Sequence, residues 1–132
     1  MHFKTHHVAF TVNSLDESIK WYCDTLGFTL VNRFKRPVRD TALLRKDAVQ
    51  IELFGINIGL KPLPNYRKNL LEDLQVVGTK HLCIEVDDLD KTVSMLKKKG
   101  VEFVIAIDQA SFGGSYTFFK DCNGILIELY QA

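Results

Sequence analysis

Two short motifs contain the side chains of this sequence that are best suited to chemistry, and each motif occurs twice. A histidine opens an apolar segment at His7 and again at His81, and a glutamate stands inside an Ile-Glu-Leu triplet at Glu52 and again at Glu128. Neutral imidazole and carboxylate are suitable ligands for zinc, nickel, cobalt, manganese or iron. Two of each would give a net charge of about −2 and leave room for water or substrate in an octahedral sphere. The doubled pair therefore predicts a site for one divalent metal ion.

The alternation of side chains along a strand supports this interpretation. Successive strand residues point to opposite faces of a sheet. Around all four residues, the branched aliphatic side chains have the opposite parity from the histidine or glutamate. A single histidine of this kind is more often a hydrogen-bonded core residue, and a single strand glutamate is more often a solvated edge residue. The same parity repeated four times favours the metal site, because two sheets curved towards each other would bring all four residues onto one concave surface.

The spacing of the motifs indicates an internal duplication. His81, Leu89 and Asp90 follow His7, Leu15 and Asp16 by 74 residues, and Glu128 follows Glu52 by 76. A match at both ends of each half, with a drift of two residues in the middle, is typical of a duplicated supersecondary unit.

Local signals predict the elements of the first half. Ser14 and Glu17 have capping-box spacing, and Gly27 would end the helix that they begin. Alternating β-branched and aromatic residues predict strands around this helix. The predicted strands are 6–12, 28–34, 41–44 and 48–54, with a turn at Arg45-Lys46-Asp47.

The second half has the same order of signals. Asp87 or Asp88 can cap a helix whose buried stripe is Leu89, Val93 and Leu96, and Gly100 would end it. Strands are predicted at 101–107, 115–120 and around Glu128, with an Asn-Gly turn at 121–124. Glycine and proline interrupt residues 57–78, which predicts a linker with a short helical turn at 70–74.

Length and composition predict one globular domain in a reducing compartment. The chain has 132 residues, of which 46% are hydrophobic and 25% charged, and its net charge is +1. This balance excludes the electrostatic signature of a nucleic-acid partner, and no apolar run has the length of a membrane helix. The three cysteines lack CxxC spacing, so free thiols and a cytoplasmic location are expected.

The sequence resembles the vicinal oxygen chelate superfamily over nearly its whole length. The resemblance lies in His7-Val8-Ala9-Phe10, in Ser14 to Ser18, in Trp21 to Phe28, in Ile51-Glu52-Leu53, in His81 with Val86 to Asp90, and in Phe118 to Leu129. It implies an α+β fold in which two βαβββ modules form a curved, cup-like mixed sheet. The implied modules are 5–58 and 79–131, joined by the linker 59–78 within a single domain 1–132. By motif position, the metal ligands are His7, Glu52, His81 and Glu128.

The resemblance also implies a reaction. Glyoxalase I, a member, isomerises the hemithioacetal of a small thiol and methylglyoxal, so a metal-dependent lyase or isomerase of that type is expected, similar to lactoylglutathione lyase. One Ni, Zn, Co or Mn ion would stabilise an enediolate, and Glu52 or Glu128 would move a proton. Symmetry does not choose between the two glutamates. Glu128 is favoured because it follows the Asn123-Gly124 turn and has Tyr130 beside it.

Three other functions compete with this prediction. Methylmalonyl-CoA epimerase belongs to the same superfamily, and that resemblance calls for a further carboxylate in the middle strands, where Asp40 and Asp47 are the candidates. An extradiol-type dioxygenase needs two histidines and one carboxylate, which leaves Glu52 surplus. A protein that sequesters a small molecule is the third alternative. In each case the partners are a small-molecule substrate or ligand and a second copy of the chain in a homodimer, since half-cups expose strand edges.

Basic residues are concentrated in the first half of the chain. Such a group can bind the carboxylates of a thiol peptide or the phosphates of coenzyme A. A solvated strand face is the more ordinary explanation. The residues concerned are Arg33, Lys35, Arg36, Arg39, Arg45 and Lys46.

Overall fold

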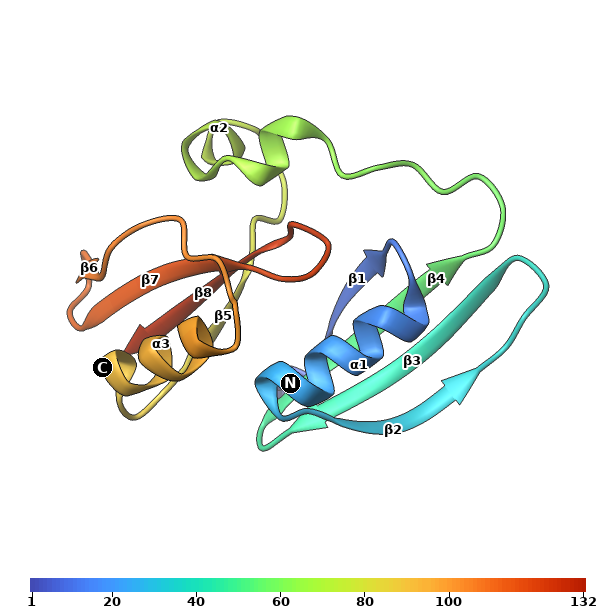
Figure 1. Cartoon of the computed structure of the whole chain (residues 1–132), viewed down its shortest axis with the longest axis horizontal. Coiled ribbons are helices and arrows are strands. Elements are labelled where there is room, and N and C mark those ends of the chain that lie inside the picture. The colour runs from blue at the N-terminus through green and yellow to red at the C-terminus, as the bar shows by residue number, and fades with distance from the viewer. The chain divides into compact units, whose positions relative to one another are not determined.

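The computed structural model describes all residues, 1–132, and divides into two compact units, Met1–Pro62 and Leu63–Ala132. Each unit is described by itself. Both contain a strand, a helix and three further strands in the same order (Figure 1). The first unit contains β1 (Val8–Val12), α1 (Leu15–Leu26), β2 (Thr29–Phe34), β3 (Arg39–Lys46) and β4 (Val49–Ile56). The second contains η1 (Asn65–Lys68), α2 (Leu70–Leu74), β5 (Leu82–Glu85), α3 (Leu89–Lys98), β6 (Asp108–Gln109), β7 (Ser115–Lys120) and β8 (Leu126–Gln131).

The two sheets share one topology. Their strand orders are β1-β4-β3-β2 and β5-β8-β7-β6, and only the pairs β1–β4 and β5–β8 are parallel. Val8 pairs with Ile51, and Leu82 pairs with Ile127, so the parallel pairs also share one register. The predicted α+β fold with two βαβββ repeats is therefore confirmed, and the duplication extends to individual strand partners.

The helices begin and end at the predicted signals. The Ser14 side chain accepts a hydrogen bond from the Glu17 backbone N–H at 3.3 Å, and Gly27 ends α1 in the left-handed conformation at φ 76°. Asp88, one of the two candidates, caps α3 by accepting from the Lys91 N–H at 2.9 Å. Both helices therefore start where a short polar side chain satisfies an otherwise unpaired backbone donor.

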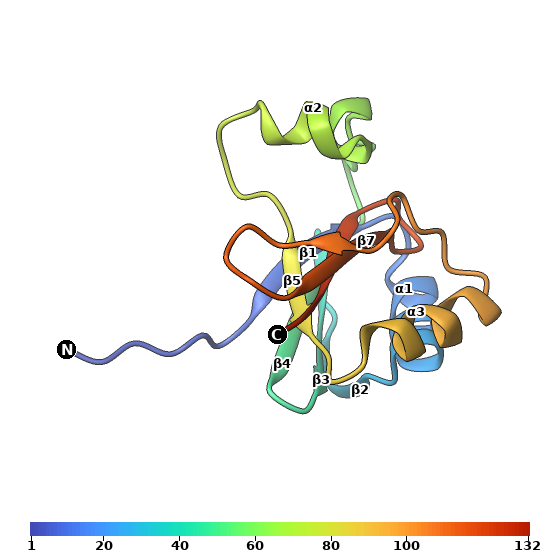
Figure 2. The ribbon, with the colours of Figure 1, turned by 90° about the vertical axis from the view of Figure 1, so that its left-hand side faces the viewer.

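The core of the first unit lies between α1 and one face of its sheet, which Figure 2 shows nearly edge-on. Leu15 and Tyr22 of α1 are buried together with Leu44, Ile51 and Leu53 of β3 and β4. Full burial of each such side chain contributes roughly 1.5–3 kcal/mol. The approach is close. A Cβ added to Gly55 would lie 2.9 Å from the Cβ of Leu15, so the glycine allows the helix to pack directly on β4.

In the second unit, α3 packs on β8 in the corresponding way. Leu89, Val93 and Leu96 are buried as the stripe predicts, and Ile127 and Leu129 form the sheet side of this core. The apolar parity predicted around both glutamates is confirmed, because the aliphatic neighbours of Glu52 and Glu128 are the residues that the helices cover.

Residues 101–107 differ from the predicted strand. Only Phe103 forms a bridge, to Phe119, and β6 is limited to Asp108–Gln109. Two backbone hydrogen bonds still join the segment to β7, from the Val104 N–H to the Phe118 carbonyl and from the Lys120 N–H to the Glu102 carbonyl, both at 3.0 Å. At Ile105 the Thr117 hydroxyl, not a backbone N–H, donates to the carbonyl at 2.9 Å. The segment's alternating apolar residues therefore pack against the sheet without forming a regular ladder.

The turn between β3 and β4 also differs from the prediction. Arg45 and Lys46 remain in β3, opposite Gln50 and Val49, and the turn is formed by Asp47 and Ala48. Asp47 has a φ of 50°, a conformation that aspartate tolerates better than most residues. The tight two-residue turn lengthens both strands and gives Arg45 a cross-strand partner.

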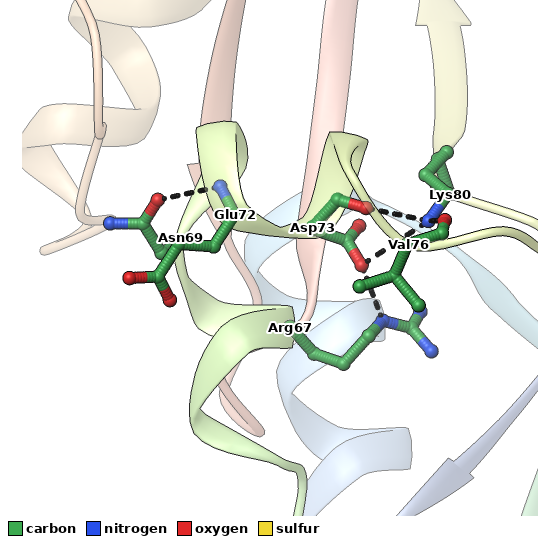
Figure 3. Close-up of polar contacts among 6 residues, drawn as sticks. All are labelled: Arg67, Asn69, Glu72, Asp73, Val76 and Lys80. Carbon is green, nitrogen blue, oxygen red and sulfur yellow. Dashed lines mark hydrogen bonds and ion pairs between the residues drawn. The ribbon is translucent and has the colours of Figure 1, made fainter.

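The predicted linker 59–78 contains η1 and, at the predicted position, α2. Asp73 of α2 is buried and forms ion pairs with Arg67 Nε at 3.1 Å and Lys80 Nζ at 3.7 Å (Figure 3). Lys80 also donates to the Asp73 and Val76 carbonyls. This cluster fastens α2 to the residues that lead into β5. No helix of the chain combines the length and apolar character needed to cross a membrane.

Candidate metal-binding half-sites

The first histidine–glutamate pair lies on the face of the first sheet that α1 does not cover. His7 stands one residue before β1, and Glu52 lies in β4, directly opposite Ala9. His7 Nε2 is 3.5 Å from Glu52 Oε1, and the two side chains are 37% and 31% exposed. The pair is thus accessible to solvent and presents one nitrogen and one oxygen donor.

A chain of polar contacts supports His7 from behind. His7 Nδ1 lies 2.8 Å from His6 Nδ1, the His6 carbonyl accepts from Gln50 Nε2 at 2.7 Å, and the Gln50 side-chain oxygen accepts from Arg45. Figure 2 shows the residues before β1 running out from the unit, so this contact fastens the segment where it joins the sheet. A hydrogen bond at Nδ1 orients an imidazole and leaves Nε2 for a ligand.

The second pair is closer and less exposed. His81 Nε2 is 2.9 Å from Glu128 Oε2, and the side chains are 19% and 14% exposed. The ring of Phe118, the cross-strand neighbour of Glu128 in β7, meets the His81 ring edge to face at 4.7 Å between centroids. The second imidazole thus packs against the ring of Phe118, whereas the first imidazole makes a polar contact with His6.

Cys83 is the cross-strand neighbour of Glu128 in β5. Although the residue as a whole is exposed, partial burial of its thiol, and next the charge of Glu128, raise its pKa to about 12. Near neutral pH the group is therefore a thiol rather than a thiolate. All three cysteines are free, as predicted.

The structure brings each histidine together with the glutamate of its own unit. Within either unit, no third His, Cys, Asp or Glu side chain completes a group that could hold a metal ion. The donors themselves suit a divalent ion, because an imidazole nitrogen and a carboxylate oxygen face each other in both pairs. Each pair therefore presents two of the four donors that the sequence predicts.

Sequence reasoning did not identify the residues that support the pairs. Gln50 and Arg45 act through the β3–β4 register and through a contact to the His6 backbone, which local sequence does not reveal. The side-chain alternation of β4 was the available signal, since it places Gln50 on the same face as Glu52. The hydroxyl of Tyr130 donates a hydrogen bond to the Gly113 carbonyl at 2.9 Å, so this hydroxyl is engaged by the loop that precedes β7.

The two middle-strand carboxylates have structural positions. Asp40 accepts from the Arg36 backbone N–H at 3.0 Å and shapes the β2–β3 connection. Asp47 lies in the β3–β4 turn with its side chain 88% exposed. Neither carboxylate is placed beside a histidine–glutamate pair in the first sheet.

Comparison with known proteins defines the class. The family model of the glyoxalase/bleomycin resistance protein/dioxygenase superfamily matches residues 4–129, so the chain belongs to this superfamily. The uncharacterized protein YaeR of Escherichia coli is 33% identical over 97% of this chain and 95% of its own length. Mouse mitochondrial methylmalonyl-CoA epimerase is 29% identical over 98% of this chain and 73% of its own.

A solved structure has the same fold. The glyoxalase family protein from Enterococcus faecalis superposes with a TM-score of 0.80, at 24% identity and with 96% of each chain covered. The predicted resemblance to the superfamily is thus confirmed, and its members with named activities include enzymes.

Proposed function

We propose that the protein is a metal-dependent isomerase, or lyase, of glyoxalase I type. Its substrate would be the hemithioacetal of a thiol with methylglyoxal or a similar small carbonyl compound. The observation that carries the proposal is the repeated donor pair. In both units a histidine Nε2 faces a glutamate carboxylate, on the sheet face left free by the helix. Membership of a superfamily that includes glyoxalase I supports the proposal.

In this proposal His7, Glu52, His81 and Glu128 together hold one Ni, Zn, Co or Mn ion. Each unit contributes one nitrogen and one oxygen, and two donors alone are fewer than the three or four that proteins use for such ions. Both pairs are therefore required, either from one chain or from two copies of it.

The chain's own residues would divide the work between binding and proton transfer. When bound, the ion supplies positive charge that stabilises an enediolate. The neutral imidazoles of His7 and His81 donate through Nε2 and carry no charge to the site. One glutamate takes the proton from the carbon beside the carbonyl and returns it to the neighbouring carbon, so the substrate is isomerised without loss or gain of atoms. Phe118 shields the second pair from water.

Metal analysis tests the proposal first. Protein purified without a histidine tag should contain about one ion per four-residue set, and chelation should lower its melting temperature. A ligand present at 100 times its dissociation constant stabilises the folded state by about 2.7 kcal/mol. His7→Ala and His81→Ala should each lose this stabilisation. Absence of metal, together with no thermal shift from nickel, cobalt, zinc or manganese, contradicts the proposal.

Turnover tests the reaction. Metal-loaded protein should convert methylglyoxal in the presence of thiols and lose this activity on chelation. An iron-dependent ring cleavage without hemithioacetal turnover would instead indicate the dioxygenase. Tight ligand binding without turnover would indicate a sequestering protein.

A methylmalonyl-CoA epimerase-like activity is the second candidate, and the 29% identity to the mouse epimerase favours it. The positions of Asp40 and Asp47 weigh against it, because one is bonded to the backbone and the other is at a turn. Exchange of the proton next to the thioester carbonyl of methylmalonyl-CoA, measured in deuterated water, distinguishes the two activities.

A further inference from the structure

The two half-sites differ in charge at one pair of equivalent positions. The shared register makes Phe54 equivalent to Tyr130, and Arg39 equivalent to Gly114. In the first unit the guanidinium of Arg39 lies over the Phe54 ring, 5.6 Å from its centroid. In the second unit a Cβ at Gly114 would meet the Tyr130 hydroxyl at 2.6 Å, so the tyrosine fills the corresponding space.

Arg39 differs from the other five members of the basic group at residues 33–46. Arg33 is paired with Asp16 at 2.6 Å, Arg45 is bonded to Gln50, and Lys46 lies 4.0 Å from Asp47. Lys35 and Arg36 lie outside the strands, in the β2–β3 connection. Arg39 is exposed, makes no ion pair, and stands on the sheet face that carries Glu52.

The distance along β4 between Phe54 and Glu52 limits which ligands can reach both Arg39 and the reacting centre. Phe54 is two residues along β4 from Glu52, which corresponds to roughly 7 Å. A group bound by Arg39 is therefore separated by several bonds from a carbonyl that reacts beside Glu52. A guanidinium presents a planar fork of donors that matches the oxygens of a carboxylate or phosphate. The contact with the Phe54 ring helps to hold the guanidinium on this face of the sheet.

We propose that Arg39 and Phe54 form an anion-binding subsite that recognises a carboxylate or phosphate at the end of the substrate remote from the reacting carbonyl. The inference rests on the proposed function for the reacting carbonyl, and it extends that function to a substrate class. The substrate is a conjugate in which a carboxylate or phosphate is carried several bonds from the carbonyl. The second unit, with neutral Tyr130 in the equivalent place, makes no such contact.

Steady-state kinetics with three thiols tests the subsite. The nickel-loaded full chain is assayed with methylglyoxal hemithioacetals of glutathione, which carries carboxylates, of coenzyme A, which carries phosphates, and of neutral 2-mercaptoethanol. Arg39→Gln should raise KM for at least one anionic conjugate about 10-fold to 100-fold, with little change in kcat, because a charge-assisted hydrogen bond is lost. The KM of the neutral conjugate should stay within 2-fold. Arg39→Lys, which retains the charge but not the fork, should give an intermediate KM.

Arg36→Gln is the matched control, because it removes the same charge three residues away, outside the strand. It should leave all three KM values within about 2-fold. An equal effect of Arg36→Gln, or an equal effect of Arg39→Gln on the neutral conjugate, overturns the subsite. The larger of the two anionic effects identifies carboxylate or phosphate as the group recognised.

A binding series separates this inference from the proposed function. S-hexylglutathione, S-hexyl-coenzyme A and neutral 2-(hexylthio)ethanol are titrated into the metal-loaded protein by calorimetry, which needs no turnover. If no hemithioacetal is converted, the proposed function fails, while selective weakening of an anionic conjugate by Arg39→Gln still supports the subsite. A wild-type protein that binds neither anionic conjugate overturns it.

Discussion

The Gln50 side chain donates a hydrogen bond to the backbone carbonyl of His6, with 2.7 Å between the two atoms. This contact joins β4 to the residue before His7, which itself lies outside the β1 ladder. The Arg45 guanidinium donates a hydrogen bond to the side-chain oxygen of Gln50 at 2.8 Å. The first imidazole therefore depends on a polar contact from a neighbouring strand rather than on its own strand.

Replacing Gln50 with leucine should weaken metal binding. Leu126 occupies the equivalent position in β8, so this variant introduces the residue that the second unit already uses. Loss of outer contacts of this kind typically reduces metal affinity about 10-fold to 100-fold. Calorimetric titration with Ni²⁺ measures the change, and the visible spectrum of the Co²⁺ form reports whether the ligand geometry has altered. An unchanged affinity and spectrum would show that Gln50 does not position His7.

Asp73 should be important for the stability of the second unit. Asp73→Asn leaves Arg67 and Lys80 without their common counter-charge in a site where the carboxylate is only 3% exposed. Breaking a fully buried pair costs about 3–5 kcal/mol, and the partial exposure of both basic side chains lowers the expected loss to about 2 kcal/mol. Urea unfolding followed by circular dichroism measures the change. The control is Glu72→Gln, the same charge change at an exposed neighbour, which should stay within about 0.5 kcal/mol; equal losses in the two variants would argue against the buried cluster.

The elements that could be predicted are those specified by local chemistry. Ser14, Gly27 and Asp88 determine the helix ends through caps that depend on a few adjacent residues. The parity of Ile51 and Leu53 around Glu52 follows from the alternation of a strand, and both are fully buried. Residues 101–107 show the same alternation without forming a strand, because their backbone pairing with β7 is limited to the bridge at Phe103 and its flanking hydrogen bonds, and the partners in β7 are distant in sequence.

The histidines and glutamates of the candidate site could be predicted from the sequence, but the residues that contact and orient them could not. Two histidines and two glutamates are visible as repeats, whereas the contact of Gln50 with His6 joins residues 44 positions apart. The packing of Phe118 on His81 likewise depends on cross-strand register. That all four ligands meet at one ion stays a prediction, as do the single domain and its module bounds.

We expect a homodimer in solution. Each four-stranded sheet leaves two edge strands, which proteins usually cover. Light scattering should give twice the chain mass of 15.1 kDa at micromolar concentration. A monomeric mass throughout a dilution series in this range would contradict the expectation.

Mixing two inactive variants shows whether a dimer shares its sites between chains. One variant carries His7→Ala and Glu52→Gln, and the other carries His81→Ala and Glu128→Gln. If each site combines units from two chains, a mixed dimer has one site with all four ligands, and an equal mixture regains about one quarter of the wild-type sites. If each site forms within one chain, the mixture stays inactive.

The two glutamates should differ in their effect on turnover, and Glu128 is the expected base. Its side chain is 14% exposed, against 31% for Glu52, so fewer water molecules compete for the proton at the second pair. Glu128→Gln keeps an oxygen donor in place and removes the base, which typically lowers the rate about 10²-fold to 10⁴-fold. Metal content should be retained in this variant, and Glu52→Gln, the matched change in the first unit, should keep more activity. Normal turnover by Glu128→Gln, with a metal-loaded but inactive Glu52→Gln, would exchange the two roles.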